Sequence, residues 1–267
     1  MRRIVVVATA LAVLIAAASA FAASGGLNTY SATLKFSPNK AGSSKSPSAL
    51  GFNQKYTAGG TPGSGNRTAP LIDITTKIYG LVSDGKDFPT CSLNKIAQAG
   101  KDTGCPKGAL VASGSITALI GSQSDQSTAG TLGTCNALLH VWNAGQGKIV
   151  FFFVDQAPNH LCLRGGITTG EVGPYPGTVK TVGKTLVMDT PIPSYVSFPT
   201  GLEGSLTSLN LNWKNLSTKL KNGKTAHYGV SVACKGGKRP YSETFTAVPQ
   251  AGGTPSSTTV NGTQKCS

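Results

Sequence analysis

The sequence predicts an all-β protein: a single disulfide-stapled β-sandwich of about ten strands with one short helix. Three observations lead to this prediction. Apolar and polar residues alternate in many short segments, turns rich in Gly and Pro separate these segments, and 6 cysteines are spread along the chain. An alternation with a period of two is typical of a strand that buries one face.

The N-terminal third contains the first alternating segments. Residues 30–36, 50–56 and 72–78 each place apolar side chains at every second position over much of their length. The turn at 37–42 and the Gly-, Ser- and Pro-rich loop at 57–70 separate these segments. We therefore predict three strands here, joined by a turn and a long loop.

One short helix is predicted directly after Cys91. Ser92 is a suitable N-cap, Leu93 and Ile96 fall on one helical face, and Gly100 can end the helix in a left-handed conformation. The helix then lies between two cysteines and is expected to be held by a disulfide.

The clearest hairpin is predicted in the middle of the chain. It consists of strands at 132–142 and 148–155 with a Gly-rich turn between them. Residues 149–154 are apolar without interruption, so this strand is expected to be buried on both faces. The other predicted strands lie at 110–120, 186–188, 207–213, 228–234, 241–247 and 258–266.

The N-terminus has the pattern of a cleaved secretory signal. Residues 1–22 contain two arginines, an apolar run at 4–18 and small residues near the cleavage point. The apolar run is short for a membrane span, and we predict no span in the mature chain. We expect a flexible mature N-terminus at 23–29, one sandwich domain at 30–267, and secretion to the cell envelope or beyond it.

The cysteines are predicted to form structural disulfides, because exported proteins fold where thiols oxidise. Six cysteines allow 15 pairings, and their positions group them into three neighbouring couples. A zinc site is the alternative, but no C-x₂-C spacing is present, and we predict no metal or other cofactor. The predicted couples are Cys91 with Cys105, Cys135 with Cys162, and Cys234 with Cys266.

Three motifs resemble those of uncharacterised secreted proteins from actinobacteria. The motifs are Ser-Pro-Asn-Lys-Ala-Gly at 37–42, Phe-Pro-Thr-Cys at 88–91 and Cys-Pro-Lys-Gly at 105–108. The resemblance implies an extracellular or envelope location. It implies no activity, since the family has none that can be transferred.

The chain is strongly basic, with 24 Lys and Arg against 10 Asp and Glu and a net charge of +14. Removal of Arg2 and Arg3 with the signal leaves 22 basic side chains and a net charge of +12. Only Arg67, Arg164 and Arg239 remain as arginines, and lysine lacks the forked donors that suit shaped phosphate recognition. An anionic cell-wall polymer or polysaccharide is therefore a better candidate partner than nucleic acid.

One basic segment is the candidate anion-binding site. No acidic residue lies between Glu203 and Glu243, and seven basic residues lie in this interval. If their turns share one end of the sandwich, they form a cationic rim. The alternative is a set of solvated lysines that serve only solubility. The seven residues are Lys214, Lys219, Lys221, Lys224, Lys235, Lys238 and Arg239.

The sequence contains no recognisable catalytic motif. Of the three histidines, His140 is expected to be half-buried in a strand and His227 to be solvated, while His160 follows Asp155 in a loop. A triad of Asp155 and His160 with a serine is conceivable, but no serine is marked by its surroundings. We predict no catalytic residues.

Two acidic residues and two tryptophans lie within predicted strands. Asp73 and Glu243 are the acids to consider for a carboxylate pair, and both are expected to face solvent. Trp142 and Trp213 are expected to be core residues. Tyr175 and Tyr195, in Pro-rich loops, are better placed to meet a ligand, but packing in a Tyr-Pro turn explains Tyr175 equally well.

These observations favour a secreted, non-catalytic binding or structural module. Two alternatives stay open: a secreted hydrolase with an unrecognised site, and a protein that binds an anionic wall polymer through the basic rim. The sequence does not predict the oligomeric state.

Overall fold

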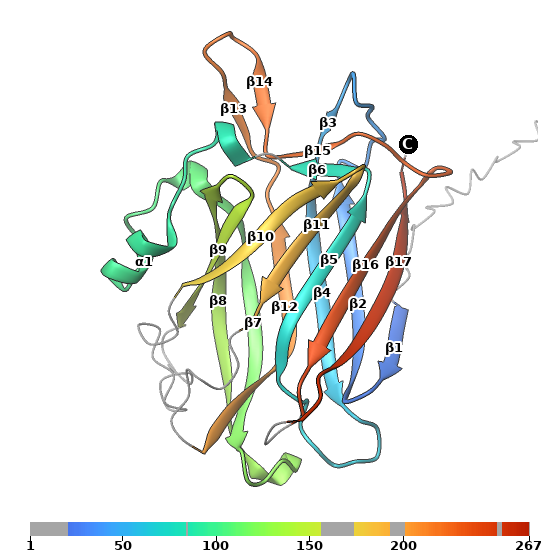
Figure 1. Ribbon diagram of the computed structural model, residues 1–267, viewed down its shortest axis with the longest axis vertical. Coiled ribbons are helices and arrows are strands. Elements are labelled where there is room, and N and C mark those ends of the chain that lie inside the picture. Colours follow the sequence, from blue (N-terminus) through green and yellow to red (C-terminus); the bar gives the residue numbers. More distant parts are fainter. Residues whose placement is uncertain (1–20, 84, 156–173, 193–200, 250–252, 267) are drawn as a thin grey trace, which may run out of the picture.

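The computed structural model describes residues 21–83, 85–155, 174–192, 201–249 and 253–266. The described chain is mostly β-strand with one short α-helix, which confirms the all-β prediction. Figure 1 shows the strands running between two ends of an elongated molecule, with the helix on one side.

Twelve strands form one antiparallel sheet, in which each strand is hydrogen-bonded to its neighbours. Their order across the sheet is β1 (Phe21–Gly25), β2 (Asn28–Ser37), β4 (Gly51–Gly60), β12 (Leu202–Trp213), β7 (Leu110–Ser122), β8 (Thr131–Gly145), β9 (Lys148–Asp155), β10 (Tyr175–Val182), β11 (Thr185–Pro191), β5 (Leu71–Tyr79), β16 (Lys238–Ala247) and β17 (Ser256–Lys265).

The remaining elements are short. A three-stranded sheet contains β3 (Ser48–Ala49), β15 (Gly229–Ser231) and β6 (Leu81–Ser83), and a two-stranded hairpin contains β13 (Ser217–Lys219) and β14 (Thr225–His227). The helices are α1 (Leu93–Ala99) and three 3₁₀ turns, η1 (Gly85–Asp87), η2 (Lys107–Ala109) and η3 (Thr128–Gly130).

The sheet curls on itself, so the predicted sandwich of two separate sheets is corrected to a nearly closed barrel. β17 packs against β1 and β2 at the opposite edge of the same sheet. The backbone N–H of Phe36 donates to Oε1 of Gln264 at 2.7 Å, and Nδ2 of Asn39 donates to the carbonyl of Lys265 at 2.6 Å. Side-chain bonds therefore join the two edges where a strand ladder is absent.

The inward face of the curled sheet forms the core. Tyr30 on β2 stacks on Phe245 on β16, with ring centroids 4.3 Å apart, and Phe52 on β4 stacks on Trp213 on β12 at 5.5 Å. Figure 1 shows β16 and β5 crossing in front of β2 and β4. The Tyr30–Phe245 pair joins strands that are not neighbours in the sheet, whereas Phe52 and Trp213 are cross-strand neighbours on β4 and β12. Burial of large aromatic rings is a major stabilising contribution in such a core.

A small second core lies outside the barrel, between β8, β9 and the loop that carries α1. The cap prediction is confirmed: Oγ of Ser92 accepts from the N–H of Lys95 at 3.2 Å, and Gly100 is left-handed with φ of 60°. Ile96 packs here with Val150 and Phe152, while neighbouring side chains of β9 point into the barrel. The strand is thus buried on both faces at 149–152, whereas Phe153 and Val154, which the prediction included, are half-buried.

Two predicted disulfides are present. Cys91 and Cys105 close the α1 loop with Cα atoms 5.4 Å apart, and Cys234 and Cys266 join the turn before β16 to the end of β17 at 6.5 Å. Cys135 is also disulfide-bonded, and its predicted partner Cys162 lies outside the described residues.

At the N-terminus, the predicted signal lies almost wholly outside the described residues, which begin at Phe21. The segment 23–29, expected to be flexible, contains part of β1 and the start of β2. In the part of the chain that the structure describes, no helix has the length and apolar character needed to cross a membrane.

Candidate functional site

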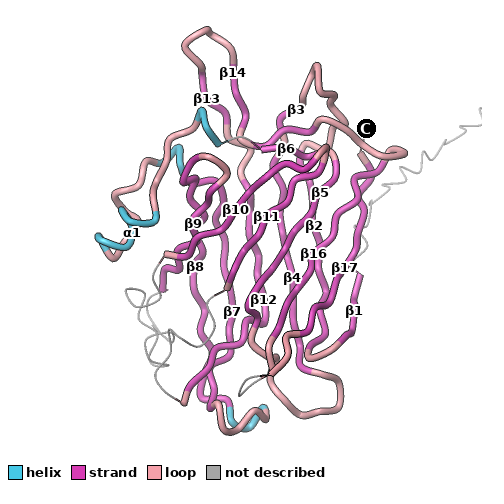
Figure 2. Tube along the Cα trace, viewed as in Figure 1, coloured by secondary structure: helices cyan, strands magenta, loops and turns pink. Residues whose placement is uncertain are grey.

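Lysines gather at one end of the barrel, which we call the lysine end. It comprises the turns 37–50 and 183–184, the segments 79–83, 85–90 and 213–238, and the end of β17 (Figures 1 and 2). Hydrogen bonds tie these segments together: Gly80 N–H donates to the carbonyl of Lys184 at 2.7 Å, and Tyr228 N–H to that of Leu216 at 3.0 Å. The lysines in these segments are Lys40, Lys45, Lys86, Lys184, Lys214, Lys219, Lys221, Lys224, Lys235, Lys238 and Lys265.

The opposite end, which we call the arginine end, contains no lysine in its loops at 59–70, 121–131 and 253–256. The basic side chain in these loops, Arg67, is buried and ion-paired: Nη2 lies 2.9 Å from Oε1 of Glu203, and both side chains are 0 % exposed. The Arg67 guanidinium also donates to three backbone carbonyls, of Ser122, Asp125 and Ser127, at 2.7–3.0 Å. This arginine therefore joins loops and offers no charge to a partner.

Most of the predicted anion-binding residues are exposed at the lysine end. Lys219, Lys221 and Lys224 lie on the β13–β14 hairpin, and Lys235 and Lys238 lie at the turn before β16. Figure 1 shows the hairpin and this turn at the same end of the barrel but on different sides of it. The lysines are thus distributed over the end and do not form one compact cluster.

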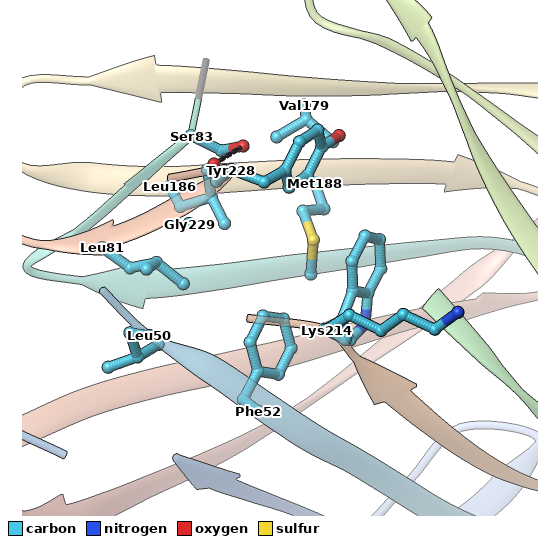
Figure 3. A pocket seen from close by; sticks show the side chains of 11 residues that line it. Leu50, Phe52, Leu81, Ser83, Val179, Leu186, Met188, Lys214, Tyr228 and Gly229 are labelled. Carbon is cyan, nitrogen blue, oxygen red and sulfur yellow. Dashed lines mark hydrogen bonds between the residues drawn. The ribbon is translucent and has the colours of Figure 1, made fainter. Parts of the chain in front are cut away.

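Lys214 is half-buried, and burial lowers the pKa of its ammonium group. It lies at the margin of an apolar pocket that Phe52, Leu81 and Met188 also line, and Figure 3 shows its ammonium group pointing away from Phe52. The cavity there is only about 20 Å³, room for about one water molecule. The barrel interior is therefore packed at this end, and a ligand for Lys214 must approach from outside.

Arg239 is a correction to the predicted rim, because its side chain is buried. Its guanidinium donates to Oγ of Ser231 at 2.6 Å and to the carbonyls of Tyr79 and Lys40 at 3.1 and 3.2 Å, and it lies over the Phe36 ring. Burial lowers its pKa to about 10, so it stays charged at neutral pH. The missed signal was its phase: Arg239 is two residues from the inward-facing side chain at 241.

Glu243 is the second correction, since it points into the barrel and is fully buried. Its Oε1 accepts hydrogen bonds from Nε2 of Gln54 and, at 3.3 Å, from Oγ1 of Thr76, while Gln54 accepts from Nε1 of Trp213 at 3.0 Å. Burial raises the pKa of Glu243 to about 7. Like Arg239, it lies in the same alternating set as the inward-facing apolar residues of β16. This alternation predicts an inward-facing side chain, although the acidic character of Glu243 favours an exposed one.

Asp73 lies on the outer face of β5, where it is half-buried. Oγ1 of Thr75 donates to Asp73 at 2.9 Å and to Asp189 of β11 at 3.2 Å, which brings two carboxylates together. Burial, and after it the nearby Asp189, raises the pKa of Asp73 against the opposing effect of the Thr75 hydroxyl. This pair lies on the strands, away from the turns of the lysine end.

His140 forms a contact that the sequence did not predict. Its Nδ1 lies 2.6 Å from Oδ2 of Asp102, which also accepts from Nε1 of Trp142 at 3.0 Å. Asp102 belongs to the Cys91–Cys105 loop, so the contact holds that loop against β8. His140 is half-buried as predicted, and both Trp142 and Trp213 are core residues as predicted. The side chain of Asp155 and all of His160 lie outside the described residues.

Comparison with protein-family models, curated proteins and solved structures finds no match to this chain.

Proposed function

We propose that this chain is an exported, non-catalytic binding protein that attaches to an anionic cell-wall polymer or polysaccharide through its lysine end. The observation that carries the proposal is the separation of charge along the barrel. The turns at one end carry many exposed lysines, whereas the loops at the other end contain no lysine and bury Arg67 against Glu203. An excess of charge of one sign over one end of a protein attracts polyanions over distances of about a Debye length.

Export is part of the proposal. Its support is the apolar N-terminal run with flanking arginines, together with disulfides that persist in oxidising compartments. The resemblance to secreted actinobacterial proteins points in the same direction.

The choice of polymer over nucleic acid rests on the chemistry of the cations. The exposed cations at the lysine end are lysines, and the arginine there, Arg239, is enclosed by protein acceptors. Lysine attracts anions as a hydrated point charge, without the bidentate geometry with which arginine binds phosphates and base edges.

The test is co-sedimentation of the oxidised mature protein with isolated cell walls at low and high salt. We expect binding at low salt that weakens steadily as salt rises, since screening shortens the reach of exposed charges. Soluble polyphosphate and polygalacturonate are the competitors. Failure to bind walls or either polyanion at low salt would remove the proposal.

A further inference from the structure

A groove of about 270 Å³ lies on the outer surface where β2, β4 and β12 reach the lysine end. Gly51 is part of its lining, at a point where two segments of the chain approach closely. A Cβ atom on Gly51 would lie 2.7 Å from the carbonyl oxygen of Trp213. The volume is just below the usual range for small-molecule sites, which fits one small unit of a larger ligand. Its polar lining consists of Lys35, Ser37, Asn53, Asn212, Lys214 and Asn215.

Most polar side chains that line this groove have no hydrogen bond or ion pair with another described residue, and Asn53 is the exception. Lys35 and Lys214 form no ion pair with a described carboxylate, and the side-chain amides of Asn212 and Asn215 form no hydrogen bond to a described residue. Asn53 donates to Oδ1 of Asn210 at 3.0 Å, which fixes its amide and leaves its own Oδ1 available as an acceptor beside the groove. Two cations and several amides thus converge on one hollow.

The groove also opens onto a path long enough for a chain molecule. On the outer face, Lys35 is paired across strands with Asn53, Asn53 with Asn212, Asn212 with Ser113, and Ser113 with His140. Residues paired in this way lie on the same face of a sheet, and the strand spacing makes the row roughly 19 Å long. None of these five side chains is fully buried.

We propose that this groove binds one anionic, hydroxyl-bearing unit of the polymer, with the two lysine ammonium groups on the oxyanion and the asparagine side chains on the hydroxyls. The inference rests on the proposed function and makes it specific: the end as a whole supplies attraction, and the groove supplies a defined contact. Amides suit hydroxyls because each offers both a donor and an acceptor. The oxyanion is a phosphate of a polyol phosphate or a carboxylate of a uronic acid.

Variants with equal charge loss separate the groove from the general field. Lys35→Gln/Lys214→Gln removes two charges from the groove, and Lys219→Gln/Lys224→Gln removes two from the β13–β14 hairpin. Binding to polyphosphate and polygalacturonate is measured at physiological salt, where long-range attraction is screened. We expect the groove double variant to lower affinity by about tenfold or more, because hydrogen bonds to charged groups are lost. The loss of affinity in the hairpin double variant should be several-fold smaller.

A second variant tests the groove independently, in case the first one does not fold. Asn212→Asp adds a negative charge at an exposed position and removes no lysine, so it is expected to weaken binding about as much as the groove double variant. Thermal unfolding of each variant gives the control for folding. If both lysine pairs lower affinity equally and Asn212→Asp has no greater effect than an exposed Asp elsewhere, the groove is not a site, although the proposed function stands. If the wild-type protein binds neither polymer, both proposals are overturned.

Small probes then identify the oxyanion. Glycerol 3-phosphate and galacturonate are titrated separately while the side-chain amide NMR signals of Asn212 and Asn215 are followed, with glycerol and inorganic phosphate as controls. Saturable shifts with one of the two probes, absent in Lys35→Gln/Lys214→Gln, support the site and name its anion. Shifts that are equally large with inorganic phosphate alone, and that spread over all exposed lysines, would contradict it.

Discussion

The two ends of this barrel differ in whether their positive charges are buried and paired or exposed to solvent. At the arginine end, the guanidinium of Arg67 is enclosed, paired with Glu203 at 2.9 Å and bonded to three loop carbonyls. At the lysine end, ammonium groups are left on turns and on the β13–β14 hairpin, and most of them are exposed. A buried cation that is bonded to protein acceptors holds loops together, whereas cations left in solvent are available to an external anion.

Arg239 shows that location alone does not decide this role. It lies at the lysine end in both sequence and space, yet its guanidinium is bonded to protein acceptors as thoroughly as that of Arg67. The relevant difference is therefore between engaged and unengaged cations. Mutations should separate the two classes, since the first should affect unfolding and the second should affect binding.

The largest effect is expected at the arginine end. Glu203→Gln removes the charge that compensates buried Arg67, and loss of one partner of a buried ion pair typically costs about 3–5 kcal/mol. Urea unfolding with the disulfides intact measures the free energy, and polyanion binding by the folded variant should be unchanged. A loss below about 1 kcal/mol would mean that Arg67 does not depend on this carboxylate.

The next effect lies between the ends, at Glu243, and depends on pH. Its pKa is about 7 in the folded protein against an ordinary value of 4.5, so the folded state holds the proton more tightly than the unfolded state. The stability associated with this proton is complete below the unfolded pKa and is lost as pH rises through the folded pKa. The loss between pH 4.5 and above 7 should amount to about 3 kcal/mol.

Glu243→Gln is the matched test, since it keeps an acceptor for Gln54 and cannot ionise. Unfolding free energies of both proteins are compared from pH 4 to pH 8. We expect the wild-type curve to fall over this window relative to that of the variant. Parallel curves would show that Glu243 does not titrate as its burial implies.

A smaller effect is expected for Arg239→Lys. Lysine keeps the positive charge but cannot reach the separate acceptors that the guanidinium joins, so we expect a loss of stability of about 2 kcal/mol. Because the side chain is enclosed, polyanion affinity of the folded variant should stay at the wild-type value. Weaker polyanion binding with unchanged thermal stability would instead show that Arg239 contributes to anion binding.

The smallest effect on stability is expected on the hairpin. Replacing Lys219, Lys221 and Lys224 with Gln should change the unfolding free energy by less than about 0.5 kcal/mol, since the side chains are exposed. Polyanion binding at low salt should nevertheless weaken, and its dependence on salt should become shallower. A variant that binds as well as the wild type at every salt concentration would show that these lysines serve another purpose.

The sequence predicted the local structure more accurately than the closure of the sheet. Ser92 and Gly100 bound the helix as expected, and the apolar run at 149–152 is buried on both faces. Period-two alternation identifies which face of a strand is buried, but it carries no information on whether the strands form two sheets or one curled sheet. The bonds from Gln264 and Asn39 that join the sheet edges link residues more than 200 positions apart and leave no local pattern.

The candidate site was predicted only in part for the same reason. The lysines of the hairpin and the turn were found because they form a charge run in the sequence. Lys35 was missed, since it lies far from that run and meets Lys214 only through the pairing of β2 and β12 with β4. Arg239 and Glu243 were misplaced because charge was given more weight than strand phase.

The most direct test of the lysine end as the binding surface is to map where a polyanion contacts the protein. Hydrogen exchange or backbone chemical shifts are compared with and without polygalacturonate or polyphosphate at low salt. We expect changes confined to the lysine end, at residues 35–45, 212–224 and 235–238. Changes centred on the loops at 59–70 and 121–131, where no lysine lies, would contradict this assignment.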